Sequence, residues 1–113
     1  MKRWFVVLFL LGVSTGLWSQ GQGNIWYFGE GLGLDFNGAN PAPLEDGQIF
    51  GNPQSMGEAL RSEGSATISD ASGSLLFYSD GEQIWNRDHE LMPNGTGLEG
   101  MYSSTHAAFI VPR

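Results

Sequence analysis

The stretch EGSATISDASGSLLFYSDGEQIWN at residues 63–86 decides the fold of this chain, because it has the pattern of three short β-strands joined by tight turns. The runs ATIS at 66–69, SLLFYS at 74–79 and EQIWN at 82–86 are rich in β-branched and aromatic residues. We therefore expect an antiparallel three-stranded meander here.

Turn-forming residues separate these strands. Asp70 and Gly73 bound the tetrapeptide DASG, whose composition predicts a turn. Asp80 and Gly81 follow the second strand. A type I′ turn needs positive φ at both central residues, which Asp-Gly tolerates, so we expect a type I′ hairpin loop at this dipeptide.

Further strands are expected on both sides of the meander. NIWYF at 24–28 is a run of branched and aromatic residues, and GLGLDF at 31–36 alternates as a half-buried strand does. A short strand is expected at 48–50, after a proline-rich break at 41–43. The apolar run AAFIV at 107–111 suits a strand buried on both faces.

Two segments carry no strand signal. Residues 52–62 hold Ser55 and Glu58 at the spacing of a capping box, which leaves a single helical turn and an irregular loop as open alternatives. Asn94 and Gly95 lie in a loop rich in turn formers, and we expect them to form a structural turn.

The first 21 residues have the pattern of a secretory signal peptide. Two basic residues precede an apolar run at 4–13, and small or polar residues follow it. This run is shorter than the roughly 20 residues of a membrane-spanning helix, so we expect no lasting membrane anchor. Cleavage after Ser19 or after Gly21 would leave a domain at 22–113.

Charge and cysteine content narrow the class of protein. Loss of the basic residues at 2–3 with the leader leaves three arginines against twelve acids, a net charge of −9. This charge repels nucleic-acid backbones, and no nucleic-acid partner is expected. The sequence has no cysteine, so disulfides cannot stabilise an exported chain.

Together these signals predict an all-β fold of antiparallel meander sheets, resembling the first blade or blades of a β-propeller. Open meanders leave unpaired edges, which propellers protect by repeating the sheet radially. At roughly 40 to 50 residues per blade, the chain has the length of about two blades. We therefore expect a partial β-propeller-like domain, an incomplete fragment whose missing blades a longer parent chain supplies.

Several sequence blocks resemble one group of exported proteins. They are NIWYFGEGLGLDFN at 24–37, EGSATISDASGSLLFYSDG at 63–81, IWNRDHELMPNGTGL at 84–98 and SSTHAAFIVP at 103–112. In this order they are similar to the N-terminal propeller-like region of Bacteroidota proteins that carry type IX secretion or gliding-motility sorting domains. The resemblance implies a secreted or surface-displayed module and transfers no catalytic set.

Candidate ligand-binding residues are few. Trp26, Tyr27 and Trp85 could stack on sugar rings, although aromatic residues in strands more often pack in the core. Of these, the two tryptophans are the candidate ligand-binding residues. Asp80, Glu82 and Asp88 are the candidate oxygen ligands for calcium, without an EF-hand pattern. Calcium is the one cofactor that these residues suggest.

Catalytic residues are not predicted. His89 and His106 lack the spacing of a zinc site; we expect His89 to be a solvated turn residue and His106 to begin a strand. No nucleophile elbow occurs, and Ser103 and Ser104 near His106 are too common a composition to indicate a triad.

The sequence thus predicts an exported, non-enzymatic module for binding or structural support at the cell surface. Its expected partner is an extracellular protein or glycan. Two alternatives stay open: a secreted carbohydrate-binding or carbohydrate-active protein, and a truncated gene fragment without independent function.

Overall fold

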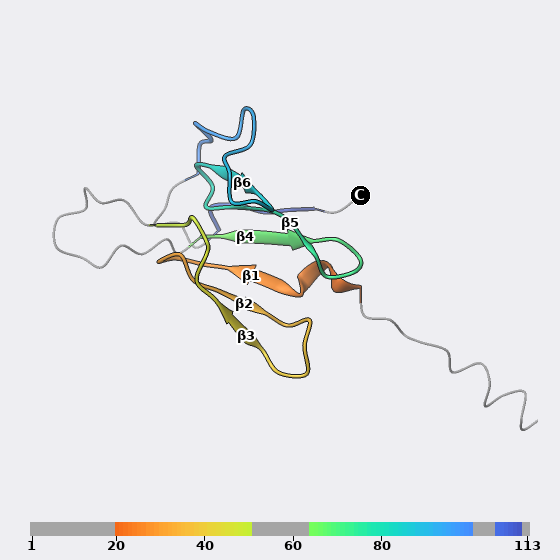
Figure 1. Ribbon diagram of the computed structural model, residues 1–113. Helices are drawn as coiled ribbons and strands as arrows, with labels where there is room; N and C mark the ends of the chain where they lie inside the picture. Colours follow the sequence, from red (N-terminus) through yellow and green to blue (C-terminus); the bar gives the residue numbers. More distant parts are fainter. Residues whose placement is uncertain (1–19, 51–63, 101–105, 112–113) are drawn as a thin grey trace, which may run out of the picture.

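The computed structural model describes residues 20–50, 64–100 and 106–111, and in these ranges the chain is all-β apart from one 3-10 turn (Figure 1). The elements, in chain order, are η1 (Gly21–Gly23), β1 (Ile25–Tyr27), β2 (Gly33–Asp35), β3 (Ala42–Leu44), β4 (Ala66–Ser69), β5 (Leu75–Ser79) and β6 (Ile84–Asn86). The predicted all-β class is confirmed. Nearly all of the predicted leader, the capping box of Ser55 and Glu58, and the pair Ser103 and Ser104 lie outside the described residues.

Strands β1, β2 and β3 form the first sheet, and both pairs are antiparallel. Trp26 pairs with Leu34, which in turn pairs with Pro43. Because side chains alternate along a strand, Ile25 and Tyr27 are buried while Trp26 between them is exposed. The strands predicted at 24–28 and 31–36 are present in shorter form.

Two predictions beside this sheet were wrong. The proline-rich segment 41–43 was expected to break regular structure, but it enters β3, which lies at the end of the sheet order, where proline is tolerated. The strand predicted at 48–50 is not formed. Ile49 is nevertheless fully buried, and its carbonyl accepts a 3.0 Å hydrogen bond from the N–H of Gly31.

The second sheet is the predicted meander β4-β5-β6, again antiparallel. Thr67, Tyr78 and Trp85 pair in a row across it and therefore share one face. A β-bulge between Ile68 and Ser69 shifts the register just before the turn.

The loop between β5 and β6 differs from the predicted type I′ turn. It comprises residues 80–83, since Ser79 pairs with Ile84. Gly81 has φ +92°, but Asp80 is not among the residues with positive φ. The Asp80 side chain instead accepts backbone hydrogen bonds from Glu82 (2.9 Å) and Gln83 (2.8 Å), which supports a longer loop.

After β6 the chain turns back on itself. An isolated β-bridge joins Trp85 to Leu91, and the N–H of Met92 donates to the carbonyl of Ile84 at 2.9 Å. Leu91 thus occupies the place of a fourth strand beside β6. Within the turn, His89 adopts φ +62°.

The prediction of a strand buried on both faces at 107–111 was also wrong. Residues 107–111 do not form a strand. Phe109 is 83% exposed and Val111 is 74% exposed. The run lies against β4 and β5 and leaves these two side chains in water, as the alternation of an extended chain permits. His106, expected to begin a strand, lies in a turn.

Side chains, not a backbone ladder, join the two sheets at β1 and β4, which lie side by side in Figure 1. The N–H of Tyr27 donates to the Thr67 hydroxyl at 2.9 Å, and the Ser65 hydroxyl donates to the carbonyl of Tyr27 at 3.0 Å. The core between the sheets consists of Ile25, Tyr27, Ile49, Tyr78 and Trp85, with Leu44 and Leu75 packed against it. No helix of the described residues is long and apolar enough to cross a membrane.

Gly73→Ala should destabilise the fold, because Gly73 has φ +88° and an added Cβ would collide with the Asn37 side chain. The left-handed conformation alone costs an alanine about 1–2 kcal/mol. The matched control is Gly23→Ala, since no atom lies within 4 Å of a Cβ at Gly23. Chemical unfolding measures both; equal midpoints for the two variants would contradict the turn geometry.

Candidate functional site

Three stacked aromatic rings fill the space between the sheets. The ring centroids of Tyr27 and Tyr78 lie 4.6 Å apart at an interplanar angle of 27°, and those of Tyr78 and Trp85 lie 5.5 Å apart at 20°. All three side chains are buried, Tyr78 completely. Such pairs contribute about 0.5–1.5 kcal/mol each beyond the burial of their area.

The hydroxyls of the two tyrosines begin a polar network. Tyr27 donates to Asp46 Oδ1 at 2.6 Å, and the Tyr78 oxygen accepts from the N–H of Gln48 at 3.1 Å. Asp46 and Gln48 come from the loop after β3. The network therefore fixes this loop over the aromatic rings of both sheets.

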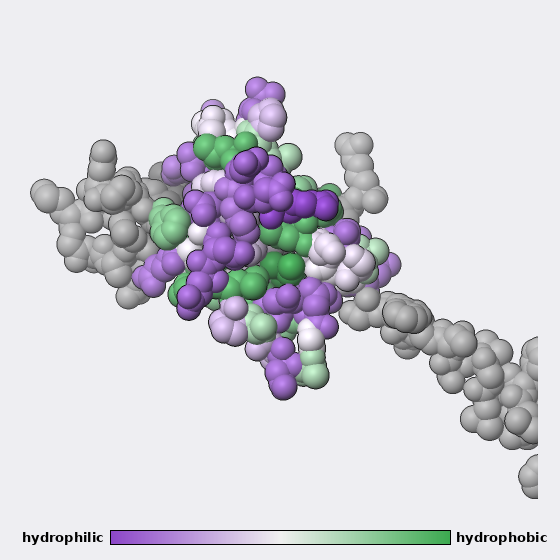
Figure 2. Space-filling model, in the orientation of Figure 1, coloured by the Kyte–Doolittle hydropathy of each residue, from purple (hydrophilic) through white to green (hydrophobic). Residues whose placement is uncertain are grey.

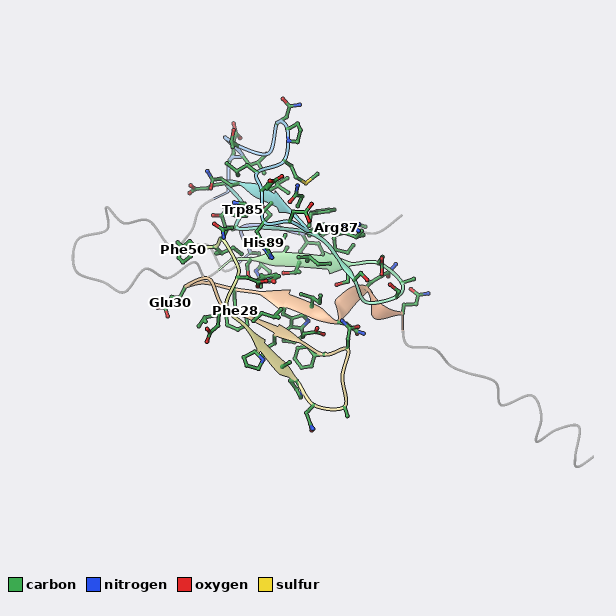
Figure 3. The ribbon with its side chains drawn as sticks, viewed as in Figure 1. Phe28, Glu30, Phe50, Trp85, Arg87 and His89 are labelled. Atoms are coloured by element: carbon green, nitrogen blue, oxygen red, sulfur yellow. The ribbon has the colours of Figure 1, made fainter. Side chains whose placement is uncertain are left out.

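His89, labelled in Figure 3 together with Trp85, completes the network. Its Nε2 lies 3.1 Å from Asp46 Oδ2, and its Nδ1 lies 2.9 Å from the Tyr78 oxygen. Every group has a partner if Nε2–H donates to Asp46 and Tyr78 donates to Nδ1. A hydrogen bond of 3.1 Å from the N–H of His89 to the carbonyl of Asn86 supports its left-handed backbone.

The environment shifts three pKa values. Burial raises the pKa of Tyr78 to about 12. Burial, followed by the hydrogen bond to Asp46, raises the pKa of Tyr27 above its usual value. The hydrogen bond from Tyr27 lowers the pKa of Asp46 in spite of partial burial, and the hydrogen bond from His89 acts in the same direction.

Asp46, His89 and Tyr78 follow the carboxylate, imidazole and hydroxyl order of a nucleophilic triad. The hydroxyl, however, belongs to a side chain with 0% exposure, and its raised pKa opposes ionisation near neutral pH. It also accepts a backbone hydrogen bond. In this geometry the three groups connect the loop after β3, strand β5 and the turn after β6.

His89 lies in a turn as predicted, but the prediction that it is solvated was wrong. Its side chain is 21% exposed and contacts Tyr27 and Tyr78 in addition to Asp46. The sequence shows a charged bend around His89 and gives no sign of Asp46 as a neighbour. The sequence signal that did point to this network was the alternation in β5, which places Tyr78 on the buried face.

The two tryptophans predicted as sugar-stacking residues lie in different environments. Trp26 is 55% exposed, its Nε1–H donates to the carbonyl of Gly23 at 2.8 Å, and its ring lies 5.1 Å from that of Phe36. Trp85 is 6% exposed and stacks on Tyr78 in the core. The structure therefore does not bring the two together as one site, and Trp26 alone presents its ring to solvent.

The predicted calcium ligands are also not gathered into one cluster. Among the described residues, no group of three or more acidic or histidine side chains is placed to hold a metal ion. Asp80 uses one carboxylate oxygen for its own loop. The N–H of Asp88 donates to the side chain of Asn86, which organises the next turn.

The predicted turn residues Asp70, Asn94 and Gly95 each lie in a hydrogen-bonded turn. Asp70 Oδ1 accepts from the N–H groups of Ser72 (2.8 Å) and Ser74 (3.0 Å), and these bonds contribute to the lowered pKa of Asp70 after the hydrogen bond from the Ser72 hydroxyl. Asn94 has φ +59°, and the N–H of Gly95 donates to the carbonyl of Met92 at 2.8 Å.

Comparison with protein families, with curated proteins and with solved structures finds no match for this chain. The resemblance to exported Bacteroidota proteins therefore stays a prediction. Any function has to be argued from the chain's own residues.

Tyr78→Phe should reduce the free energy of unfolding by about 1–3 kcal/mol, because it leaves two groups of the partly buried network, the N–H of Gln48 and His89 Nδ1, without their partner. Tyr27→Phe is the matched control and should cost less, since its acceptor Asp46 is 57% exposed and can bond water. Denaturant unfolding of both variants measures the difference. Equal losses would show that the Tyr78 hydroxyl is not held as described.

Stability should fall in alkali between pH 10 and about 12. The pKa of Tyr78 is 10.0 in the unfolded chain and about 12 in the folded one, so the folded state retains a proton that the unfolded state loses. This contribution is fully present below pH 10 and is lost as the pH approaches 12. Unfolding curves across this range measure the decline, which Tyr78→Phe should reduce. Ionisation of Tyr78 near pH 10 in the folded protein, seen by tyrosinate absorbance, would disprove it.

Proposed function

We propose that this protein is an exported, non-enzymatic β-propeller-like module that acts in binding or structural support at the cell surface. The observation that carries the proposal is the second sheet with its added bridge. Three antiparallel strands in chain order are followed by the Trp85–Leu91 bridge, in the position of the fourth strand of a propeller blade.

Two further observations support export and binding. The pattern of residues 1–21 is that of a secretory leader. The visible face in Figure 2 carries apolar areas among hydrophilic ones, and exposed apolar patches often mark interaction sites. The exposed aromatic residues of the first sheet include Trp26, Phe28 and Phe36.

A second candidate function, carbohydrate binding, is favoured by Trp26. Its indole is more than half exposed, and one hydrogen bond and one aromatic contact fix its orientation. Aromatic side chains with these properties bind ligands at small entropic cost. A carbohydrate-binding role is compatible with a module displayed at the surface.

The test of the main proposal is the location of the protein in the cells that produce it. The full chain should appear in the surface or extracellular fraction and be cut by protease added to intact cells. A variant without residues 1–21 should stay inside, because the leader directs export. A cytosolic marker enzyme is the control for lysis. Full-length protein that stays in the cytosol would overturn export, and specific hydrolysis of a polysaccharide would overturn the non-enzymatic assignment.

A further inference from the structure

Two hollows meet along the junction of the sheets. One, of about 300 Å³, is lined by Trp26 and Phe28 on the β1 side and by Ser65 and Thr67. The other, of about 230 Å³, is lined by Ser65 and Thr67 again and by Phe109. Because the two hollows share these two residues, they adjoin one another at Ser65 and Thr67, and we treat them together as one surface. We call it the Trp26 groove, lined by Trp26, Phe28, Ser65, Thr67 and Phe109.

Each of the two hollows that make up the Trp26 groove is lined by an exposed aromatic side chain. Trp26, in one hollow, is 55% exposed, and Phe109, in the other, is 83% exposed. The indole ring is held by the carbonyl of Gly23 and by Phe36. A rigid aromatic face of this kind contacts a flat apolar surface without losing much conformational freedom.

The two hollows share two hydroxyl groups, of Ser65 and Thr67, whose hydrogen-bonding capacity is used only in part by the residues that the structure describes. The Thr67 hydroxyl accepts from the N–H of Tyr27, so its own proton remains available as a donor. The Ser65 hydroxyl donates to the carbonyl of Tyr27, so its lone pairs remain available as acceptors. A ligand seated between Trp26 and Phe109 thus meets the Thr67 hydroxyl as a donor and the Ser65 hydroxyl as an acceptor.

The charge of the groove selects among ligands. None of the described residues that line either hollow is Lys, Arg, Asp or Glu. The chain as a whole carries a net charge of −7. A polyanion would therefore meet repulsion without a compensating cation. The groove suits a neutral ligand that has apolar faces and many hydroxyls.

We propose that the Trp26 groove binds a neutral oligosaccharide. One sugar ring stacks its C–H face on Trp26, the hydroxyls of the following residue bond Ser65 and Thr67, and the chain continues toward Phe109. The inference rests on the proposed function of a surface-displayed binding module and names its ligand class. Phe109 takes the second stacking position, which Trp85 in the core cannot supply.

The test is affinity electrophoresis of the purified full chain in gels that contain xylan, mannan or laminarin, with alginate as the anionic comparator. At least one neutral polysaccharide should retard the protein, and alginate should not. Trp26→Ala should weaken retardation about tenfold or more, and Phe109→Ala should weaken it less, because its ring is the less constrained of the two. Leu91→Ala is the matched control, since Leu91 is 49% exposed and lies outside the groove.

Retention of the fold in each variant is checked by its unfolding midpoint, because both aromatic side chains are exposed and their removal should leave the core intact. The inference is overturned if no neutral polysaccharide retards the protein, if alginate alone does, or if Trp26→Ala behaves as Leu91→Ala does. It is also overturned if Trp26→Ala changes only self-association in sedimentation. Protein that is exposed on cells but fails to bind refutes this inference alone, whereas cytosolic protein refutes the proposed function.

Discussion

Stacking of Tyr27 on Tyr78 is the interaction on which the arrangement of the two sheets depends. Tyr27 lies at the end of β1, and its backbone bonds Ser65 and Thr67 while its ring covers Tyr78. Without this contact neither small sheet has enough apolar surface to stand alone, because a few short strands need packing against another element to be stable. The hydroxyls of the same two rings then position Asp46 and His89, so burial of the aromatic rings and order in two loops are coupled.

Sequence periodicity predicted which residues form strands far better than it predicted which segments lie next to those strands in the fold. The meander at 66–86 was recognisable because alternation and turn residues are local properties. β3 was missed because proline usually ends a strand, and the edge position that tolerates it is a property of the sheet. The contact between Asp46 and His89 was missed for a related reason. It joins two loops that are far apart in the chain, and only the packed rings beneath determine where these loops meet.

The candidate site illustrates the same division between local and distant information. Trp26 could be selected from the sequence as an aromatic residue in a strand, but no local pattern distinguishes it from the buried Trp85. Burial depends on which face of each sheet meets the other. Ser65 and Thr67 carried no functional signal at all, since serine and threonine are frequent in strands. Their significance comes from lying against the edge of β1, where the bonds to Tyr27 use only part of the capacity of each hydroxyl among the described residues.

The side-chain joint between β1 and β4 also determines how the molecule responds to force. Within each sheet, strands are held by a ladder of backbone bonds that load together when the strands are pulled past one another. Between the sheets, scattered contacts bear the load: the hydrogen bonds and the stack of Tyr27, the side-chain bonds of the loops after β2 and β3, and one backbone bond from Gly21 to Ala71. Tension applied across the molecule therefore separates the sheets before it unzips either one. This line of least mechanical resistance consists mostly of side-chain contacts, so it can be strengthened or weakened without altering a single strand pairing.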